Sequence, residues 1–116
     1  MTVYDPQVID QIHTDAAKRR VYLGIVIPGP LTLERALIDA LTVKVNRYAK
    51  FVGSGDLHAK YPELRTFTPY IELAHAGGLS EQTGGLIQRL GAQLTARGIG
   101  LRTVDLDRVT DAGDER

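Results

Sequence analysis

The stretch that decides the fold is Val21-Tyr22-Leu23-Gly24-Ile25-Val26-Ile27, followed directly by Pro28-Gly29-Pro30. Its alternation makes one face strongly apolar and the other only half polar, which is typical of a central β-strand. Proline cannot donate a backbone hydrogen bond and glycine allows a turn, so Pro28-Gly29-Pro30 is expected to stop this strand. Upstream, Val8, Ile9 and Ile12 form a shorter apolar segment. The polar residues between the two segments predict a β-hairpin.

A long amphipathic helix is expected to follow the proline turn. Thr32 can cap it, and Glu34 in the first turn suits the helix dipole. Apolar residues then recur at four- and three-residue steps, which places them on one stripe of a helix about five turns long. The stripe comprises Leu33, Leu37, Leu41, Val45, Tyr48 and Val52. Gly53-Ser54-Gly55 is expected to end the helix, and residues 56–65 to form an ordered loop.

The second half of the chain predicts a strand, a helix and a strand. Side chains alternate over residues 67–73, and Pro69 indicates either an edge strand or a strand start. Ser80 is expected to cap a second helix that ends at Gly98, and residues 99–106 give the last strand. Each glycine inside this helix costs about 1 kcal/mol relative to alanine, so packing must hold it. These glycines are Gly84, Gly85 and Gly91.

The expected element order is therefore ββαβαβ. Its simplest arrangement is an α+β two-layer sandwich, in which two helices cover one face of a four-stranded sheet. The 116 residues are 43% hydrophobic and 24% charged, which suits a single soluble domain. We expect residues 1–106 to form this domain and residues 107–116 to form a frayed acidic tail.

Composition excludes several classes of function. The chain has no cysteine, so disulfides, thiolate metal sites and a cysteine nucleophile are excluded. With 14 basic and 14 acidic residues, it has no net field to draw it to nucleic acid or to an anionic membrane. The sequence MTVYDPQVID does not resemble a signal peptide, and no apolar run is long enough to span a membrane. A cytoplasmic protein that binds neither nucleic acid nor membrane is expected.

Four segments together resemble a family of small uncharacterised bacterial proteins. They are Asp5-Pro6-Gln7-Val8-Ile9-Asp10, residues 44–57 (KVNRYAKFVGSGDL), Lys60-Tyr61-Pro62-Glu63 and Ile99-Gly100-Leu101-Arg102. The resemblance extends over about residues 3–106. The chain departs from the family pattern by a glycine in the helix-ending run and by its glycine-rich second helix. The resemblance supports the element order above and implies no activity.

Catalytic and metal chemistry find little support. The histidines His13, His58 and His75 do not form a recognised metal-ligand spacing, and Glu72 and His75 on one strand would point to opposite faces. Ser54 and Ser80 are the only serines, and neither lies in a nucleophile elbow. We therefore predict no catalytic residue, no metal and no cofactor.

Anion binding is the alternative function. If the second and third strands run parallel, Pro28-Gly29-Pro30 and Ala76-Gly77-Gly78 lie at the same end of the sheet, beside two helix N-termini with free amide groups. Neither turn contains Lys or Arg, however, and turn geometry alone explains the glycines. This alternative is a small-ligand or anion-binding domain, with or without an unrecognised enzymatic activity.

The leading prediction is a small non-catalytic interaction module, such as an adaptor or an immunity-type protein. It would bind a partner protein or a second copy of itself, because tyrosine and arginine are favoured at interfaces. One candidate surface, the helix-loop surface, comprises Tyr48, Phe51, His58, Tyr61, Lys44, Arg47 and Lys50. The other is the uncovered sheet face, with Tyr22, Val26 and Tyr70. In a competing interpretation Tyr48 belongs to the core and the basic side chains are merely solvated.

Overall fold

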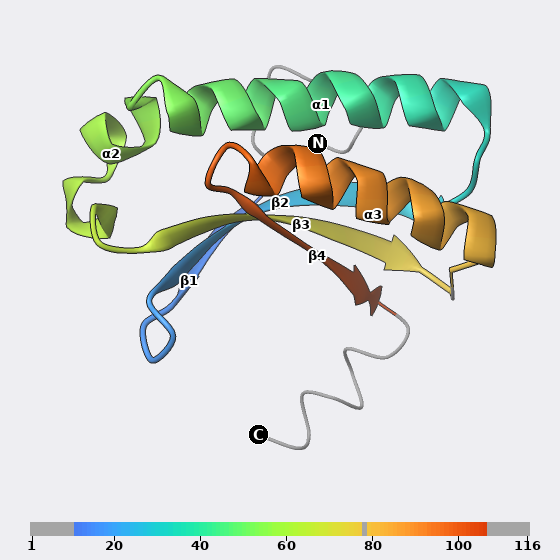
Figure 1. Cartoon of the computed structure of the whole chain (residues 1–116). Coiled ribbons are helices and arrows are strands. Elements are labelled where there is room, and N and C mark those ends of the chain that lie inside the picture. Colours follow the sequence, from blue (N-terminus) through green and yellow to red (C-terminus); the bar gives the residue numbers. More distant parts are fainter. Residues whose placement is uncertain (1–10, 78, 107–116) are drawn as a thin grey trace.

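A computed structural model describes residues 11–77 and 79–106. They form a mixed α+β domain of two layers, with the long helices above a twisted sheet (Figure 1). The strands, in their order across the sheet, are β1 (Gln11–Asp15), β2 (Arg20–Pro30), β3 (Thr68–Ala76) and β4 (Gly100–Asp105). The helices are α1 (Arg35–Gly53), α2 (Asp56–Lys60) and α3 (Glu81–Thr95), with the 3-10 helix η1 (Pro62–Leu64) between α2 and β3. The α+β class expected from the sequence is confirmed.

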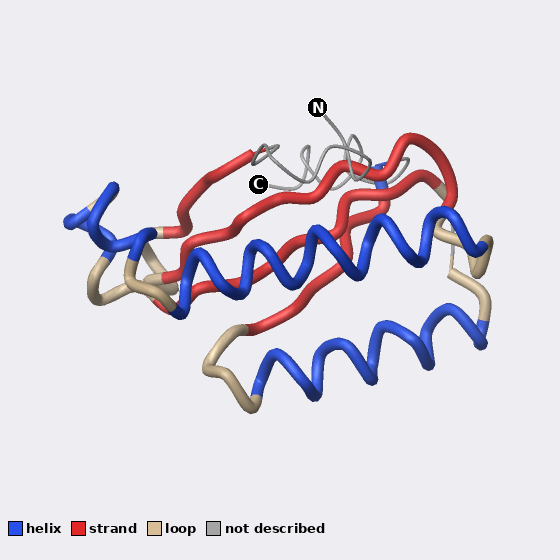
Figure 2. The backbone as a smooth tube through the Cα atoms, turned by 90° about the horizontal axis from the view of Figure 1, so that it is seen from above, coloured by secondary structure: helices blue, strands red, loops and turns tan. Residues whose placement is uncertain are grey.

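The topology explains why both long helices lie on one face. β1 is antiparallel to β2, whereas β2, β3 and β4 are parallel to one another. α1 connects β2 to β3, and α3 connects β3 to β4, so both crossovers step in the same direction along the sheet. Because such crossovers are right-handed, both helices must cover the same face. Figure 2 shows α1 lying over the strands and α3 running beside it, on the β4 side of the sheet.

The core fills the space between the sheet and these helices. Alternate residues of the strands point into it and are almost completely buried. The strand contribution comes from Val21, Leu23, Ile25, Ile27, Ile71 and Leu73. α1 adds Leu37, Leu41, Val45 and Tyr48 from its predicted stripe. The Tyr48 hydroxyl also donates to the Gly24 carbonyl at 2.9 Å, which fixes α1 to the central strand β2.

The start of α1 differs from the sequence prediction. The Thr32 hydroxyl accepts from the Glu34 backbone N–H at 3.3 Å, so Thr32 forms a local turn and does not cap the helix. The helix begins only at Arg35. Leu33 consequently lies outside the helical stripe, and it is 50% exposed.

The expected loop over residues 56–65 is largely helical, which makes the two-helix element order wrong. α2 and η1 each complete a single short turn, and each buries one leucine. These are Leu57 and Leu64, which join the core. The segment is therefore held down by packing at two points.

The strand ends also differ from the predictions. β2 continues through Pro30, which pairs with Ala76 after a register shift that follows Val26, so Pro28-Gly29-Pro30 bends the strand without ending it. The hairpin turn is confined to residues 16–19, and β1 extends to Asp15. Of the two alternatives for Pro69, the strand start is correct, because Pro69 is the second residue of β3 and β3 lies between β2 and β4.

Two further predictions fall outside the described residues. They concern the apolar pair Val8 and Ile9, and the acidic tail over residues 107–116.

Candidate functional site

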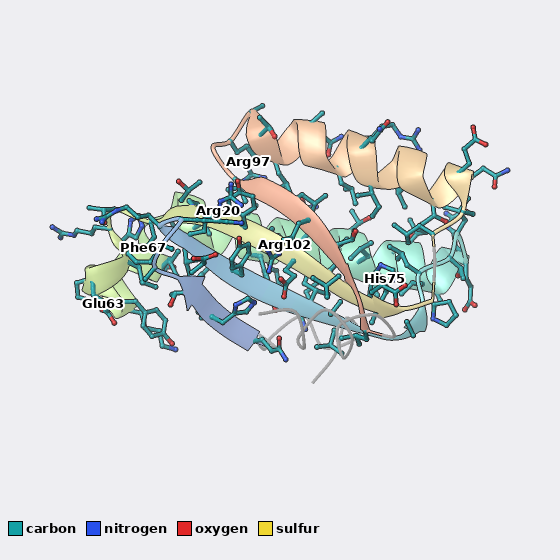
Figure 3. All side chains as sticks on the ribbon, turned by 90° about the horizontal axis from the view of Figure 1, so that it is seen from below. Arg20, Glu63, Phe67, His75, Arg97 and Arg102 are labelled. Atoms are coloured by element: carbon teal, nitrogen blue, oxygen red, sulfur yellow. The ribbon has the colours of Figure 1, made fainter. Side chains whose placement is uncertain are left out.

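The sheet face opposite α1 and α3, here called the open face, gathers charged and aromatic side chains from all four strands. Strand alternation and register place them in neighbouring positions. The open-face cluster comprises His13 from β1, Arg20 and Tyr22 from β2, Tyr70 and Glu72 from β3, and Arg102 from β4. Figure 3, seen from below the sheet, shows Arg102 near its middle and Arg20 nearer one end.

Glu72 forms the centre of the cluster. Its Oε2 accepts from Arg102 Nε at 2.7 Å and lies 2.5 Å from a terminal nitrogen of the same guanidinium. Its Oε1 lies 3.1 Å from His13 Nε2. Only 7% of the Glu72 side chain is exposed, against 39% for Arg102 and 44% for His13. The nearly buried carboxylate is thus contacted from β1 and β4, and the Arg102 guanidinium supplies the opposite charge that a buried charge requires.

Tyr22 is enclosed by the same partners and is 1% exposed. The His13 ring stacks on it with centroids 4.9 Å apart, and the Arg102 Cζ lies 3.7 Å from its ring centroid. Tyr70 approaches it at 5.4 Å in a tilted arrangement. Cation–π and aromatic contacts therefore hold Arg102 in the position in which it pairs with Glu72.

Arg20 stacks on Tyr70, with its Cζ 4.7 Å from the ring centroid. The Tyr22 hydroxyl approaches the Arg20 guanidinium without forming a hydrogen bond of standard geometry, and it is buried without a hydrogen-bond partner. This proximity is the largest cause that raises the pKa of Arg20, which keeps its charge at any physiological pH. Within residues 11–77 and 79–106, no carboxylate forms an ion pair with Arg20.

Basic residues occupy the turns at the end of the sheet where the parallel strands begin. β2, β3 and β4 are parallel, so the turns that precede them lie at the same end of the sheet. The basic rim comprises Lys18, Arg19, Arg20, Arg65 and Arg97. All except the partly exposed Arg20 are exposed. The rim has two acidic neighbours in sequence, Asp15 and Glu63.

The helix-loop surface predicted from the sequence is not one continuous exposed surface. Tyr48 is 2% exposed and Lys44 is 0% exposed, so neither can contact a partner. Lys44 lies on the same buried stripe of α1 as Leu41 and Tyr48, and its Nζ is 5.9 Å from the Tyr48 ring centroid. The competing interpretation of Tyr48 as a core residue is therefore correct. Lys44 was misassigned because its long apolar stem packs between the layers.

The other members of that predicted surface are partly or fully exposed. Phe51 and Tyr61 pack against the core edge, and His58 is partly buried with an unpartnered Nε2. Arg47 and Lys50 are exposed and line a shallow depression on the outer side of α1. These five side chains thus divide between the core margin and the outer surface of the helix.

The predicted sheet-face residues Tyr22, Val26 and Tyr70 do lie on the open face. The face is more polar than expected, because sequence reasoning missed Arg20, Glu72 and Arg102. Each lies two residues from another open-face position of its strand, so the period-2 pattern contained the signal. The strand partners of these residues were not evident from that pattern.

The anion-binding prediction required β2 and β3 to be parallel, so that two helices begin at the same end of the sheet. The end opposite the basic rim meets this condition. β2 and β3 are parallel, so α1 and α3 both begin at this end. His75 faces the helices there, is 2% exposed, and has a buried Nδ1 without a hydrogen-bond partner. Ser80 Oγ accepts from the Thr83 N–H at 3.1 Å, which confirms the predicted cap and satisfies one amide of α3.

Residues 11–77 and 79–106 contain neither a histidine–acid cluster for a metal nor a membrane-spanning helix. No group of three or more histidine or acidic side chains there is arranged to hold a metal ion. No helix of this part of the chain combines the length and apolar character needed to cross a membrane.

Fold and site together define a small two-layer α+β domain with a charged, aromatic open sheet face. The chain belongs to a family of unknown function, DUF6572, which matches residues 1–106. Comparison with curated proteins and with solved structures gave no match.

Proposed function

We propose that this protein is a non-catalytic interaction module of the cytoplasm, and that the open face with its basic rim is the surface that binds a partner protein. The observation that carries this proposal is the open-face cluster itself. Arg20 and Arg102 lie on tyrosine rings, 4.7 Å and 3.7 Å from the ring centroids. Tyrosine and arginine are enriched at the energetic centres of protein interfaces. Arg20, Arg102 and Tyr70 are the partly exposed members that a partner can contact, because Tyr22 is only 1% exposed.

The cluster is also rigid, which favours binding. Each ring and guanidinium is held by at least one neighbour across the sheet. A partner therefore meets side chains that have already lost most of their rotamer freedom, and the entropy cost of binding is lower.

Partner capture with matched variants tests this function. The protein is immobilised as the wild type, as Arg20→Glu and as Arg35→Glu, and proteins retained from an extract of its source cells are quantified by mass spectrometry. Arg35 is a suitable control because its side chain is 92% exposed at the far end of the sheet. A partner retained by the wild type and Arg35→Glu, but lost with Arg20→Glu, is expected. An identical set on all three proteins would contradict the proposal.

The second candidate function is anion binding between the starts of α1 and α3, and the unpartnered His75 Nδ1 favours it. A thermal-shift screen with phosphate, nucleotides and divalent metals tests it. A ligand at 100 times its dissociation constant stabilises the folded state by about 2.7 kcal/mol, which is easily measured. Unchanged melting across the panel would exclude this candidate.

A further inference from the structure

We propose that the partner recognised by the basic rim and the open face is an acidic polypeptide segment, held by Arg20 and the exposed rim cations. This inference rests on the proposed function and specifies the chemistry of the partner. It follows from the charge of the rim, from the way its arginines are held, and from a carboxylate that the open face already binds.

The charge of the rim favours an anionic partner. Five cations lie at the starts of the three parallel strands or in the turns before them, and among the described residues Asp15 and Glu63 are the acidic residues nearest to them in sequence. The Asp15 Oδ1 already accepts from the Lys18 N–H at 3.2 Å. The surplus of positive charge is local, because the whole chain has 14 basic and 14 acidic residues.

The rim arginines are positioned to present free N–H groups. Arg19 lies over Phe67, 5.7 Å from the ring centroid, and donates to Thr66 Oγ1 at 2.6 Å. Arg20 lies over Tyr70. A guanidinium has five N–H donors, so stacking leaves most of them for a planar acceptor such as a carboxylate.

The open face already contains one example of this recognition. Arg102 holds the Glu72 carboxylate through Nε and a terminal nitrogen, while stacked on Tyr22. Arg20 has the same kind of stacking on Tyr70, but no described carboxylate lies within ion-pair distance of it. Its cross-strand partner Asp15 acts on its charge without forming an ion pair. The neighbouring Tyr22 hydroxyl is buried without an acceptor. A partner carboxylate bound by Arg20 would repeat, at the Arg20–Tyr70 stack, the pairing that Glu72 makes with Arg102.

Two observations favour a polypeptide over a nucleic acid. Proteins that bind single strands stack bases on free aromatic faces. Here His13 and Arg102 already lie on the Tyr22 ring, and the Tyr70 ring lies under Arg20 and against Gly100. The neutral chain also lacks the net positive charge that concentrates proteins on polyanions.

The strand spacing indicates the pattern of acids that the rim would bind. Neighbouring strands lie about 4.8 Å apart, and β4 begins two residues farther along the sheet than β2, so the starts of these two strands are about 12 Å apart. In an extended peptide, side chains on one face repeat every two residues, or about 6.7 Å. Two or three acids at alternate positions therefore span the rim.

Fluorescence anisotropy with a labelled twelve-residue peptide of alternating Glu and Ala tests the inference at low ionic strength. Controls are the same peptide with Gln in place of Glu, and a twelve-nucleotide oligothymidylate. Proteins are the wild type, Arg20→Gln, Arg97→Gln and Arg35→Gln, each checked by thermal melting. Arg97 is exposed, so Arg97→Gln is expected to keep the folded state. This variant therefore still tests the inference if Arg20→Gln unfolds the protein.

The expected result is saturable binding of the Glu peptide and none of the Gln peptide. Arg20→Gln and Arg97→Gln should each weaken binding by about fivefold or more, the loss of one charge-assisted contact. Arg35→Gln should leave it unchanged. No binding of the Glu peptide, equal loss with Arg35→Gln, or tighter binding of the oligonucleotide would overturn the inference.

The capture experiment distinguishes this inference from the proposed function. If Arg20→Glu abolishes capture of a partner but the Glu peptide does not bind, the interaction surface is correct and the acidic chemistry is wrong. If neither result depends on Arg20, both proposals fail.

Discussion

Glu72 is the most enclosed charged side chain of the open face. Its carboxylate contacts Arg102 from β4 and His13 from β1. Glu72→Gln removes the charge that Arg102 compensates, and we expect a loss of about 1–3 kcal/mol in unfolding free energy. The value should lie toward the lower limit, because Arg102 is 39% exposed and regains water. Urea denaturation followed by circular dichroism measures it.

A double-mutant cycle with Arg102→Gln provides the control for this prediction. Residues in direct contact show coupling energies of about 0.5–3 kcal/mol, whereas independent sites add within a few tenths. Additive losses for Glu72→Gln and Arg102→Gln would show that the ion pair does not stabilise the fold.

Gly100 is required for a different reason, the close approach of the Tyr70 ring. A Cβ built on Gly100 falls inside the contact distance of this ring. The ring cannot move freely, because Arg20 and Tyr22 contact it. Gly100→Ala should therefore destabilise the protein by about 1–3 kcal/mol, as overpacking does. Denaturant midpoints would show it, and Gly53→Ala, where a Cβ meets nothing within 4 Å, should have little effect.

At the scale of elements, the two long helices differ in how firmly they are held. α1 buries six of its 19 residues, whereas α3 buries two of its 15, Thr83 and Leu94. Local opening depends on how much apolar contact must be broken. Backbone amides of α3 should therefore exchange with solvent faster than those of α1 in native-state hydrogen exchange. Equal protection of the two helices would show that they open only together.

The interior glycines of α3 lower its helix propensity, so a substitution there can raise the stability of the protein. A Cβ on Gly84 meets no atom within 4 Å, and this residue has no positive φ. Gly84→Ala should stabilise the protein by about 0.5–1 kcal/mol, the difference in helix propensity. A higher midpoint of thermal unfolding is expected. The reverse outcome would reveal a close approach to Gly84 that the structure lacks.

Sequence periodicity predicted the long elements and failed at the short ones. The apolar stripe of α1 repeats over several turns, so it predicts the helix correctly although Leu33 lies outside it. α2 has five residues and η1 has three, too few for a helical period to repeat. The continuation of β2 through Pro30 depends on pairing with Ala76, a contact that no local propensity encodes.

The same limit applies to the site. His13 and Glu72 are 59 residues apart in the chain, and Glu72 and Arg102 are 30 apart. Alternation indicated that Tyr22 and Tyr70 share a face, but strand order and register decide which charges meet there. The basic rim likewise appears only when β2, β3 and β4 are known to be parallel.

At the scale of the whole molecule, the rim makes a prediction about self-association. A two-fold dimer places the same surface of each copy against itself. If two open faces met about a two-fold axis parallel to the strands, the five rim cations of each copy would come together. We therefore expect a monomer at low ionic strength, where this repulsion is least screened.

Size-exclusion chromatography with light scattering measures this directly, at about 50 mM and 500 mM salt. At the lower salt concentration, we expect the mass of one chain for both the wild type and Arg35→Gln. A dimer that persists at low salt and dissociates with Arg20→Glu would identify the open face as an interface between copies. Such a result would mean that the acidic partner is a second copy of this chain, because only an acidic surface of that copy could offset the positive charge of the rim at low ionic strength.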